Sequence, residues 1–297
     1  MRKRPLDLDT NIINPNAVVK VTTMNHIVEV QYMDKSNSES FIQKLDADRY
    51  VDKRTGEIHE FQHTENRSQG ENSLRKTFNR LRELINANFT GKANELFITL
   101  TYRGDLQTND TKRIYKDFEK FIKRLRYNFK DKSTIDYINV LEPHASGNYH
   151  MHVLMRFNDL SKVFIPNAEL AEIWSNGFVK IQSLKDVDNI GAYVSAYLSD
   201  IEVDINSPHA LAEEKEVNGE KKKFVKGARL VFYKTGVNIY RKSKGIQEPK
   251  KEKMTYFEVQ KKVGFASPNF KYGIELFDDD KDFRNAIIKE QYNLKRP

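Results

Sequence analysis

The sequence predicts an α+β protein in which a central antiparallel or mixed sheet is flanked by helices. Segments with helical spacing of apolar residues alternate with short segments whose apolar and polar residues alternate as they do in strands. Two of these strands are separated only by a short turn, which is typical of an antiparallel hairpin. Strict repetition of strand, helix and strand is absent, so a doubly wound parallel sheet is not expected.

Composition restricts the kind of partner and the kind of metal site. The chain of 297 residues carries 50 Lys and Arg against 42 Asp and Glu, a net charge of +8, which favours an anionic partner such as nucleic acid. It contains no cysteine, so any metal must be held by histidines and carboxylates. No apolar run is long enough for a membrane span or a secretion signal. We therefore expect a cytoplasmic protein without a membrane partner.

The first part of the chain is predicted to be rich in strands and then to change to helix. Residues 17–33 alternate as two strands, and Thr55-Gly56 is a turn signal between two more. From Ser73 to Phe89 apolar residues follow helical spacing and arginines occupy other faces. We therefore expect a β-rich extension over residues 1–70.

The middle of the chain has the most regular patterns. Residues 95–102 alternate as a strand, and a basic amphipathic helix follows over residues 112–129. Residues 135–157 then predict a strand, a turn and a second strand. A short helix at 167–177, a strand at 178–184 and a helix at 186–201 complete a core expected over residues 71–200.

The last third is expected to extend this core. Residues 201–297 form a C-terminal extension that completes the core or packs on it, with a polar, mobile segment at about 203–226. Asp186 or Asp188 is the expected N-cap of the helix before it. At the end of the chain, Phe283, Ile287 and Tyr292 have helical spacing and predict a terminal helix.

Two histidines interrupt the second strand of the predicted hairpin, in the stretch YHMHVLM at residues 149–155. Side chains alternate along a strand, so His150 and His152 point the same way with Cα atoms ~6.8 Å apart, whereas Met151 and Val153 face the core. Pairing about residue 146 or 147 places Glu142 across from one of the histidines. Two imidazoles and a carboxylate can hold one ion with open positions for a phosphoryl oxygen.

Another interpretation of these histidines stays open. Two half-buried histidines bonded to the backbone would give the same pattern, and HMH alone favours that reading. With Glu142 included, neither interpretation is preferred, and a structural zinc is disfavoured because such sites normally have four ligands with cysteines. His144 lies in the turn and is interpreted as a solvated loop residue outside the site.

Two tyrosines lie four residues apart on the helix predicted at 186–201. Tyr193 and Tyr197 project from one side of it and border an apolar stripe, so packing alone would explain them. A tyrosine attacks phosphate effectively only when a cation stabilises the phenolate or the phosphate. The tyrosines therefore gain meaning from the neighbouring candidate metal site.

These motifs resemble a known family. FITLTY at 97–102, HMH at 150–152 preceded by Glu142, and YVSAY at 193–197 have the order of the three motifs of rolling-circle replication initiators of the HUH endonuclease superfamily. The tyrosine pair looks like that of the Rep proteins of small single-stranded-DNA phages, bacterial plasmids and integrated elements. The likeness covers roughly residues 50–297 and is strongest from 95 to 200.

The resemblance implies a split β-α-β, ferredoxin-like fold and a mechanism. Glu142, His150 and His152 would hold a divalent ion, Mg²⁺ or Mn²⁺, and Tyr193 and Tyr197 would be nucleophiles that cut and rejoin single-stranded origin DNA through a 5′-phosphotyrosine link. A host helicase and polymerase are candidate partners in a bacterial cytoplasm. The lysine that the family places near its tyrosine is absent, because Ala196 and Asp200 stand there. Lys180, Lys185 or a lysine of 112–126 is the expected replacement.

DNA contacts are expected from residues around these motifs and from basic stretches that could meet phosphates. They are Thr99, Thr101, Tyr102, Lys180, Lys185, Arg241, Lys242 and Lys244. For Tyr102, and for Tyr149, packing explains the residue equally well. A transposase or relaxase of the same superfamily, and a basic DNA-binding protein without catalysis, remain alternative functions.

Overall fold

The protein is described by a computed structural model over most of its length. The described residues are 2–9, 12–35, 41–61, 71–144, 147–185, 187–199, 201–203, 212–217, 220–225, 232–233, 236–277 and 284–296, with only the backbone described at 71–72, 197, 199, 201–203, 212–217 and 220–225. The chain divides into two compact units, residues 1–64 with 249–297, and residues 65–248. The unit that contains the expected catalytic core thus continues past residue 200.

The unit of residues 65–248 is built on a five-stranded antiparallel sheet with the order β10-β7-β9-β8-β14. Its elements are α1 (Glu71–Asn88), β7 (Glu95–Tyr102), the 3₁₀ helix η1 (Gly104–Leu106), α2 (Thr111–Asn128), β8 (Ile135–Pro143), β9 (Tyr149–Phe157), α3 (Asn167–Trp174), β10 (Gly177–Gln182), α4 (Ile190–Ser199), β11 (Ile201–Val203), β12 (Ala212–Val217), β13 (Glu220–Val225) and β14 (Tyr240–Lys242).

The order of these elements is that of a split β-α-β fold. β7, α2, β8, β9, α3 and β10 follow one another in the chain, and β9 inserts between β7 and β8 in the sheet. The α+β class predicted from the sequence is confirmed, as are the strand at 95–102 and the hairpin at 135–157.

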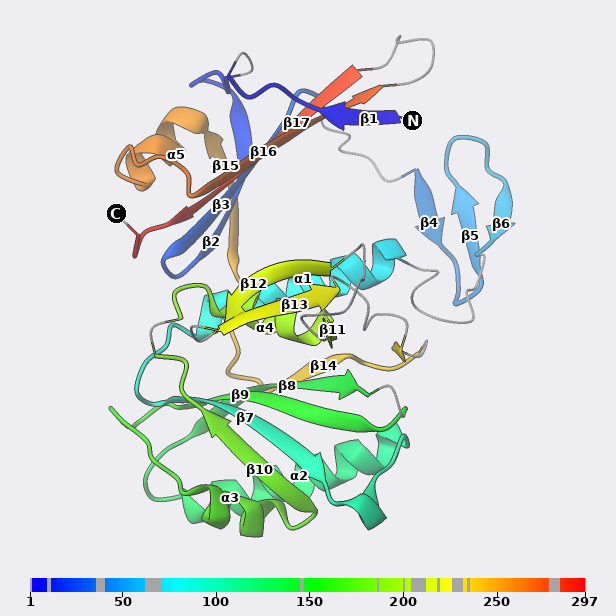
Figure 1. The fold of residues 1–297 in the computed structure, drawn as a ribbon. Coiled ribbons are helices and arrows are strands. Elements are labelled where there is room, and N and C mark those ends of the chain that lie inside the picture. Colours follow the sequence, from blue (N-terminus) through cyan, green and yellow to red (C-terminus); the bar gives the residue numbers. More distant parts are fainter. Residues whose placement is uncertain are drawn as a thin grey trace. The chain divides into compact units, whose positions relative to one another are not determined.

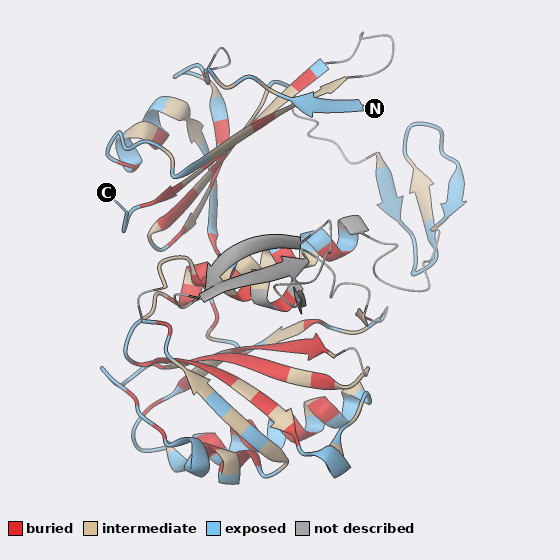
Figure 2. Cartoon of the chain, in the orientation of Figure 1, coloured by how far each residue is buried: buried red, intermediate tan, exposed pale blue. Residues whose placement is uncertain are grey.

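Helices cover both faces of this sheet (Figure 1). The apolar stripe of α2, which includes Ile114, Phe118 and Phe121, packs with α3 against one face, where Met151 and Val153 also lie. α1 and α4 pack on the other face, against Phe97 and Leu154 among others. The central strands β8 and β9 are consequently mostly buried, whereas the edge strand β10 has exposed positions (Figure 2).

The other unit contains a six-stranded antiparallel sheet with the order β1-β16-β17-β3-β2-β15. It joins strands from both ends of the chain and carries helix α5 (Tyr256–Lys262). Its strands are β1 (Arg2–Pro5), β2 (Val18–Met24), β3 (Ile27–Met33), β15 (Lys250–Thr255), β16 (Phe270–Phe277) and β17 (Arg284–Asn293), with a small second sheet of β4 (Ile42–Lys44), β5 (Arg49–Asp52) and β6 (Ile58–Glu60).

The terminal helix predicted from the sequence is wrong, because β17 is a strand. Ile288, Glu290 and Tyr292 alternate on its buried side. Glu290 hid this alternation, since a carboxylate is unexpected on an apolar face. It is accommodated by hydrogen bonds from the hydroxyls of Tyr292 at 2.7 Å and Tyr256 at 3.0 Å, and by Lys271 at 3.6 Å.

Much of the segment expected to be mobile, at about 203–226, and the Asp-rich stretch after Phe277 lie outside the described residues. In the part of the chain that is described, no helix combines the length and the apolar character needed to span a bilayer.

Candidate metal and nucleophile site

The hairpin of β8 and β9 brings the expected carboxylate and histidines together. Glu142 is the direct partner of His150, and Val140 is the partner of His152. Paired residues share a face of an antiparallel sheet, so all three polar side chains lie on the face covered by α1 and α4. The pairing predicted from the sequence is confirmed.

His152 and Glu142 are in direct contact and are both buried. Nε2 of His152 contacts Oε2 of Glu142, and the two residues are 0% and 4% exposed. Nδ1 of His152 lies 3.2 Å from the hydroxyl oxygen of Thr99 on β7. The ring orientation is therefore fixed from both sides, with one nitrogen toward the carboxylate and the other toward the neighbouring strand.

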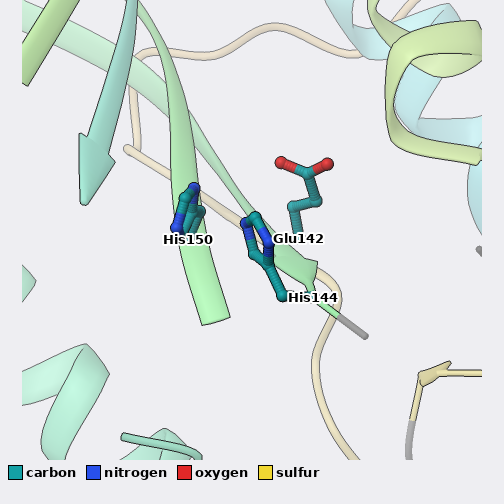
Figure 3. A group of neighbouring side chains, drawn as sticks. All are labelled: Glu142, His144 and His150. Atoms are coloured by element: carbon teal, nitrogen blue, oxygen red, sulfur yellow. The ribbon is translucent and has the colours of Figure 1, made fainter. Parts of the chain in front are cut away.

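His150 and Glu142 form a second cluster with His144, which the sequence interpretation left out. One donor atom from each of the three residues lies within 4.8 Å of the others. The rings of His144 and His150 are 3.7 Å apart between centroids, and Figure 3 shows them side by side near the carboxylate. The interpretation of His144 as a solvated loop residue is wrong, since it is half-buried beside His150.

The turn of the hairpin explains why His144 lies there. Its backbone amide donates to the carbonyl of Asn148 at 2.8 Å, and the amide of Gly147 donates to the carbonyl of His144 at 2.9 Å. Gly147 has a φ of 83°, a conformation that glycine adopts without a Cβ clash. The turn thus extends the pairing by one step, and the spacing of two residues between Glu142 and His144 could have signalled their common face.

The donor set fits a divalent ion. Ligand bonds of about 2.0–2.2 Å allow donor atoms of one ion to lie up to roughly 4 Å apart, which is close to the spread of the cluster. Carboxylates suit Mg²⁺ and Mn²⁺, whereas imidazoles suit later first-row metals and are poor partners for Mg²⁺. Glu142, His144, His150 and His152 are therefore the described residues that can hold such an ion in this unit.

Tyr193 reaches this site through Phe97. The Phe97 ring stacks on the His152 ring, with centroids 5.6 Å apart and planes 21° apart. Its other neighbour is the Tyr193 ring, at 6.5 Å and 75°. Tyr193 is half-buried on α4, so the structure places this expected nucleophile one ring away from the histidine cluster.

The start of α4 is held against α1 by amides. The side-chain oxygen of Asn189 accepts from the amide of Ala192 at 3.0 Å, so Asn189 acts as the N-cap in place of the expected Asp188; Asp186 lies outside the described residues. Asn86 of α1 accepts from the amide of Gly191 at 2.7 Å. A Cβ at Gly191 would lie 2.5 Å from the carbonyl oxygen of Arg82, so the two helices approach closely only because this residue is glycine.

The second expected nucleophile cannot be placed. Tyr197 belongs to α4, but its side chain lies outside the described part of the chain, and so does all of Asp200.

Several expected DNA-contacting residues share the face of the histidines. Lys180 is paired with Thr99, and Phe178 is paired with Thr101. Lys180 is exposed, and the side chain of Phe178 is 69% exposed. Lys185 is exposed in the turn after β10. The edge strand β10 thus presents a cation and an apolar ring beside the strand that contacts His152.

Tyr102 and Tyr149 do not support the expected base contacts. Each is 2% exposed and packs in the core on the opposite face of the sheet. The Tyr102 hydroxyl donates to Asp117 at 3.2 Å, and burial together with that carboxylate raises the pKa of Tyr102. For both tyrosines the packing alternative describes the observed environment.

The basic residues after β14 lie away from the histidines. Arg241 stacks over the Tyr115 ring on α2 at 3.3 Å, on the opposite face of the sheet. Lys242 and Lys244 line a cavity of about 660 Å³ together with Arg126, Lys130 and Asp136. This cavity lies at the start of β8, and Asp136 and Glu142 are separated by roughly 20 Å along an extended strand.

Residues 95–202 match the model of one protein family, which is described as replication-associated protein ORF2. No curated protein and no solved structure matches the chain. The matched segment begins with β7 and ends in β11, so it contains the hairpin, the histidines and Tyr193. This agrees with the resemblance to replication initiators seen in the sequence. Residues 95–202 are therefore a domain of the replication-associated protein ORF2 family.

Proposed function

We propose that this protein initiates rolling-circle replication by nicking and rejoining single-stranded DNA at an origin. The observation that carries the proposal is the cluster of Glu142, His150 and His152 joined through Phe97 to Tyr193, within a domain of a replication-associated family. A packed histidine pair would not need a buried carboxylate and a tyrosine on the same face.

The reaction is a transfer of a phosphoryl group to tyrosine. The phenolic oxygen of Tyr193 or Tyr197 loses its proton and attacks the scissile phosphorus, which forms an O–P bond and breaks the bond to the 3′ oxygen. The leaving 3′ oxygen takes up a proton and becomes the primer end for a polymerase. Because the phosphotyrosine ester retains the bond, a later attack by a 3′ hydroxyl rejoins the strand without ATP.

The histidine cluster is proposed to hold Mg²⁺ or Mn²⁺, which would polarise the phosphoryl oxygens when bound. Glu142, His150 and His152 are the proposed ligands, and His144 is a further donor beside them. Thr99 is a positioning residue, because its hydroxyl holds the ring of His152. Phe97 keeps the ring of Tyr193 at this cluster.

The path of the DNA is proposed to run along β7 and β10. Thr99, Thr101 and Lys180 are on the face of the cluster, and Phe178 offers an exposed ring on which an unpaired base can stack. Lys180 is the preferred replacement for the missing motif lysine, since α2 packs on the other face of the sheet. Lys185 extends the same cationic edge.

Covalent capture tests the proposal. Labelled single strands tiled over the DNA element that encodes the protein are incubated with the full chain and Mn²⁺, then separated under denaturing conditions. We expect one strand to form a protein adduct, and the Tyr193→Phe, Tyr197→Phe double variant to form none. Tyr127→Phe, at a tyrosine that is 69% exposed on α2, is the matched control and should form the adduct normally.

Each alternative function gives a different result. Binding that weakens with salt but never yields an adduct on any strand would contradict catalysis and indicate a DNA-binding protein without chemistry. Adducts confined to the ends of a mobile element would indicate a transposase, and adducts at a transfer origin would indicate a relaxase. A helicase and polymerase of a bacterial host are proposed partners at the nicked origin.

A further inference from the structure

One face of the six-stranded sheet gathers lysines and aromatic rings. Lys253, Lys20 and Lys289 lie on β15, β2 and β17 in one row across the sheet, which passes through Gln31 and ends at Tyr272 on β16. The next row on the same face contains Lys251, Thr22, Glu29, Gln291 and Phe270. We call the side chains of these two rows the basic sheet face.

The opposite face of this sheet is the one that carries the core of the unit. Val19, Val21 and Ile288 pack there with Val259 and Val263 of α5. Because side chains alternate along each strand, the basic sheet face points away from α5. Figure 1 shows the strands of both chain ends that contribute to it.

The charge of the basic sheet face is strongly positive. Lys20, Lys251, Lys253 and Lys289 are all exposed. Glu29 is the one carboxylate within the two rows, and it accepts a hydrogen bond from Gln291 at 2.7 Å. Lys20 and Lys289 are two strands apart, so about 10 Å separates them. An extended polyanion can therefore meet several ammonium groups at once.

The aromatic rings add a second kind of contact. Phe270 is 58% exposed, and its ring centroid lies 6.0 Å from that of Tyr272. The ammonium of Lys289 lies 5.9 Å from the centroid of the Tyr272 ring. Exposed rings interleaved with lysines are what proteins use to bind unpaired bases and phosphates together.

We infer that the basic sheet face is a second binding site for single-stranded DNA, separate from the histidine cluster. Lysines would contact phosphates along the rows, and Phe270 with Tyr272 would stack on bases at their end. The choice of DNA as the polyanion rests on the proposed function, whereas the site itself does not need the chemistry at Tyr193.

The test compares two triple variants of the full chain that change the same charge. Lys20→Gln, Lys253→Gln, Lys289→Gln removes cations from the basic sheet face. Lys250→Gln, Lys261→Gln, Lys262→Gln is the matched control in the same unit, at lysines that pair with Glu252 or lie over Phe257. Affinity for a long single strand is measured over a range of salt concentrations, with circular dichroism to verify folding.

We expect the face variant to bind at least about 10-fold more weakly and to lose about 2 from the slope of log affinity against log salt, since each phosphate contact on a single strand contributes ~0.7. Phe270→Ala should weaken binding with an unchanged slope, and Phe257→Ala on α5 should not. Equal affinity of the face variant, the control and the wild type would overturn the inference.

Nicking of a short strand limited to the cut site separates the two proposals. The face variant should form the covalent adduct on that strand at the normal rate. If the wild-type chain forms no adduct but the difference in salt slope is present, the proposed function fails and the DNA-binding face stands. If adducts form but the slopes are equal, the face is excluded and the nickase stands.

Discussion

Glu142 and His152 contact each other across the β8–β9 hairpin although neither is exposed to solvent. The ring of His152 is held in place by Thr99 on the neighbouring strand. The carboxylate also lies within reach of His144 and His150, so one acidic side chain links three imidazoles. Partners that orient a ligand in this way usually change metal affinity when they are removed.

Thr99→Val should therefore weaken Mn²⁺ binding by roughly 10-fold to 100-fold while the fold persists. Valine has the shape of threonine but cannot hydrogen-bond Nδ1 of His152. The measurement is a calorimetric titration with Mn²⁺. Thr77→Val is the control, because the Thr77 hydroxyl donates within α1 to the carbonyl of Ser73. An unchanged affinity in Thr99→Val would show that this contact does not position the ring.

His144→Ala should lower the affinity for Mn²⁺ about 10-fold and narrow its preference over Mg²⁺, because an imidazole donor is lost from the cluster. Thermal stability is measured with increasing concentrations of each ion. His59→Ala, at a partly exposed histidine that stacks on Tyr50 in β5, should leave the ion-dependent shift unchanged. Identical shifts in both variants would place His144 outside the metal site.

Phe97→Leu should slow formation of the phosphotyrosine link by roughly 10-fold to 100-fold, because misplacement of a nucleophile by about 1 Å has effects of this size. Phe97 contacts the rings of His152 and Tyr193, and each aromatic pair contributes about 0.5–1.5 kcal/mol. Phe89→Leu is the control, at a buried phenylalanine next to Arg156. A loss of rate that follows the loss of stability equally in both variants would argue against positioning.

Phe178→Ala should reduce affinity for single-stranded DNA that contains the cut site by about 1–3 kcal/mol, the contribution of one stacked base. Phe164→Ala removes a ring that is 82% exposed in the same unit and should change affinity little. Equilibrium binding by fluorescence anisotropy distinguishes them. If both variants bind like the wild type, the DNA does not follow β10.

Asp136→Asn should destabilise the protein near neutral pH and lose this effect in acid. Burial opposes ionisation of Asp136, but hydrogen bonds from Ser243 at 2.7 Å and Asn158 at 3.0 Å outweigh it and lower the pKa of this carboxyl below 3.8. A lowered folded-state pKa stabilises the protein above the unfolded-state value, and this contribution disappears as the pH falls through the folded-state value.

Urea unfolding of the two proteins checks this dependence. The difference in unfolding free energy should be about 1 kcal/mol near pH 7, allowing for solvent screening, and should shrink below about pH 4. Asp131→Asn, at an exposed aspartate in the turn after α2, should have little effect at either pH. A difference for Asp136→Asn that stays constant with pH would contradict the assignment.

Local patterns predicted most of the unit that carries the histidines. β7 and the β8–β9 hairpin have alternation that a short window reveals, and their partners are close in the chain. β17 was misread because its register depends on β3, more than 250 residues earlier, and because the buried Glu290 breaks its apolar alternation. Tertiary pairing, rather than local preference, determines such a strand.

The site was predicted where it depended on strand alternation and missed where it depended on the turn. Glu142 and His150 face each other as the spacing required, whereas His144 reaches them through the turn that Gly147 allows. Tyr102 failed as a DNA contact for a related reason. Its parity along β7 places it with the core, opposite to Thr99 and Thr101.

The discontinuous composition of the six-stranded sheet has a consequence during protein synthesis. Residues 65–248 emerge from the ribosome as one uninterrupted stretch, so the histidine cluster and Tyr193 can assemble while translation continues. β3 must wait for its neighbour β17, which is nearly the last segment made. A premature stop codon after residue 248 would therefore remove half of that sheet and leave the encoded nicking site complete.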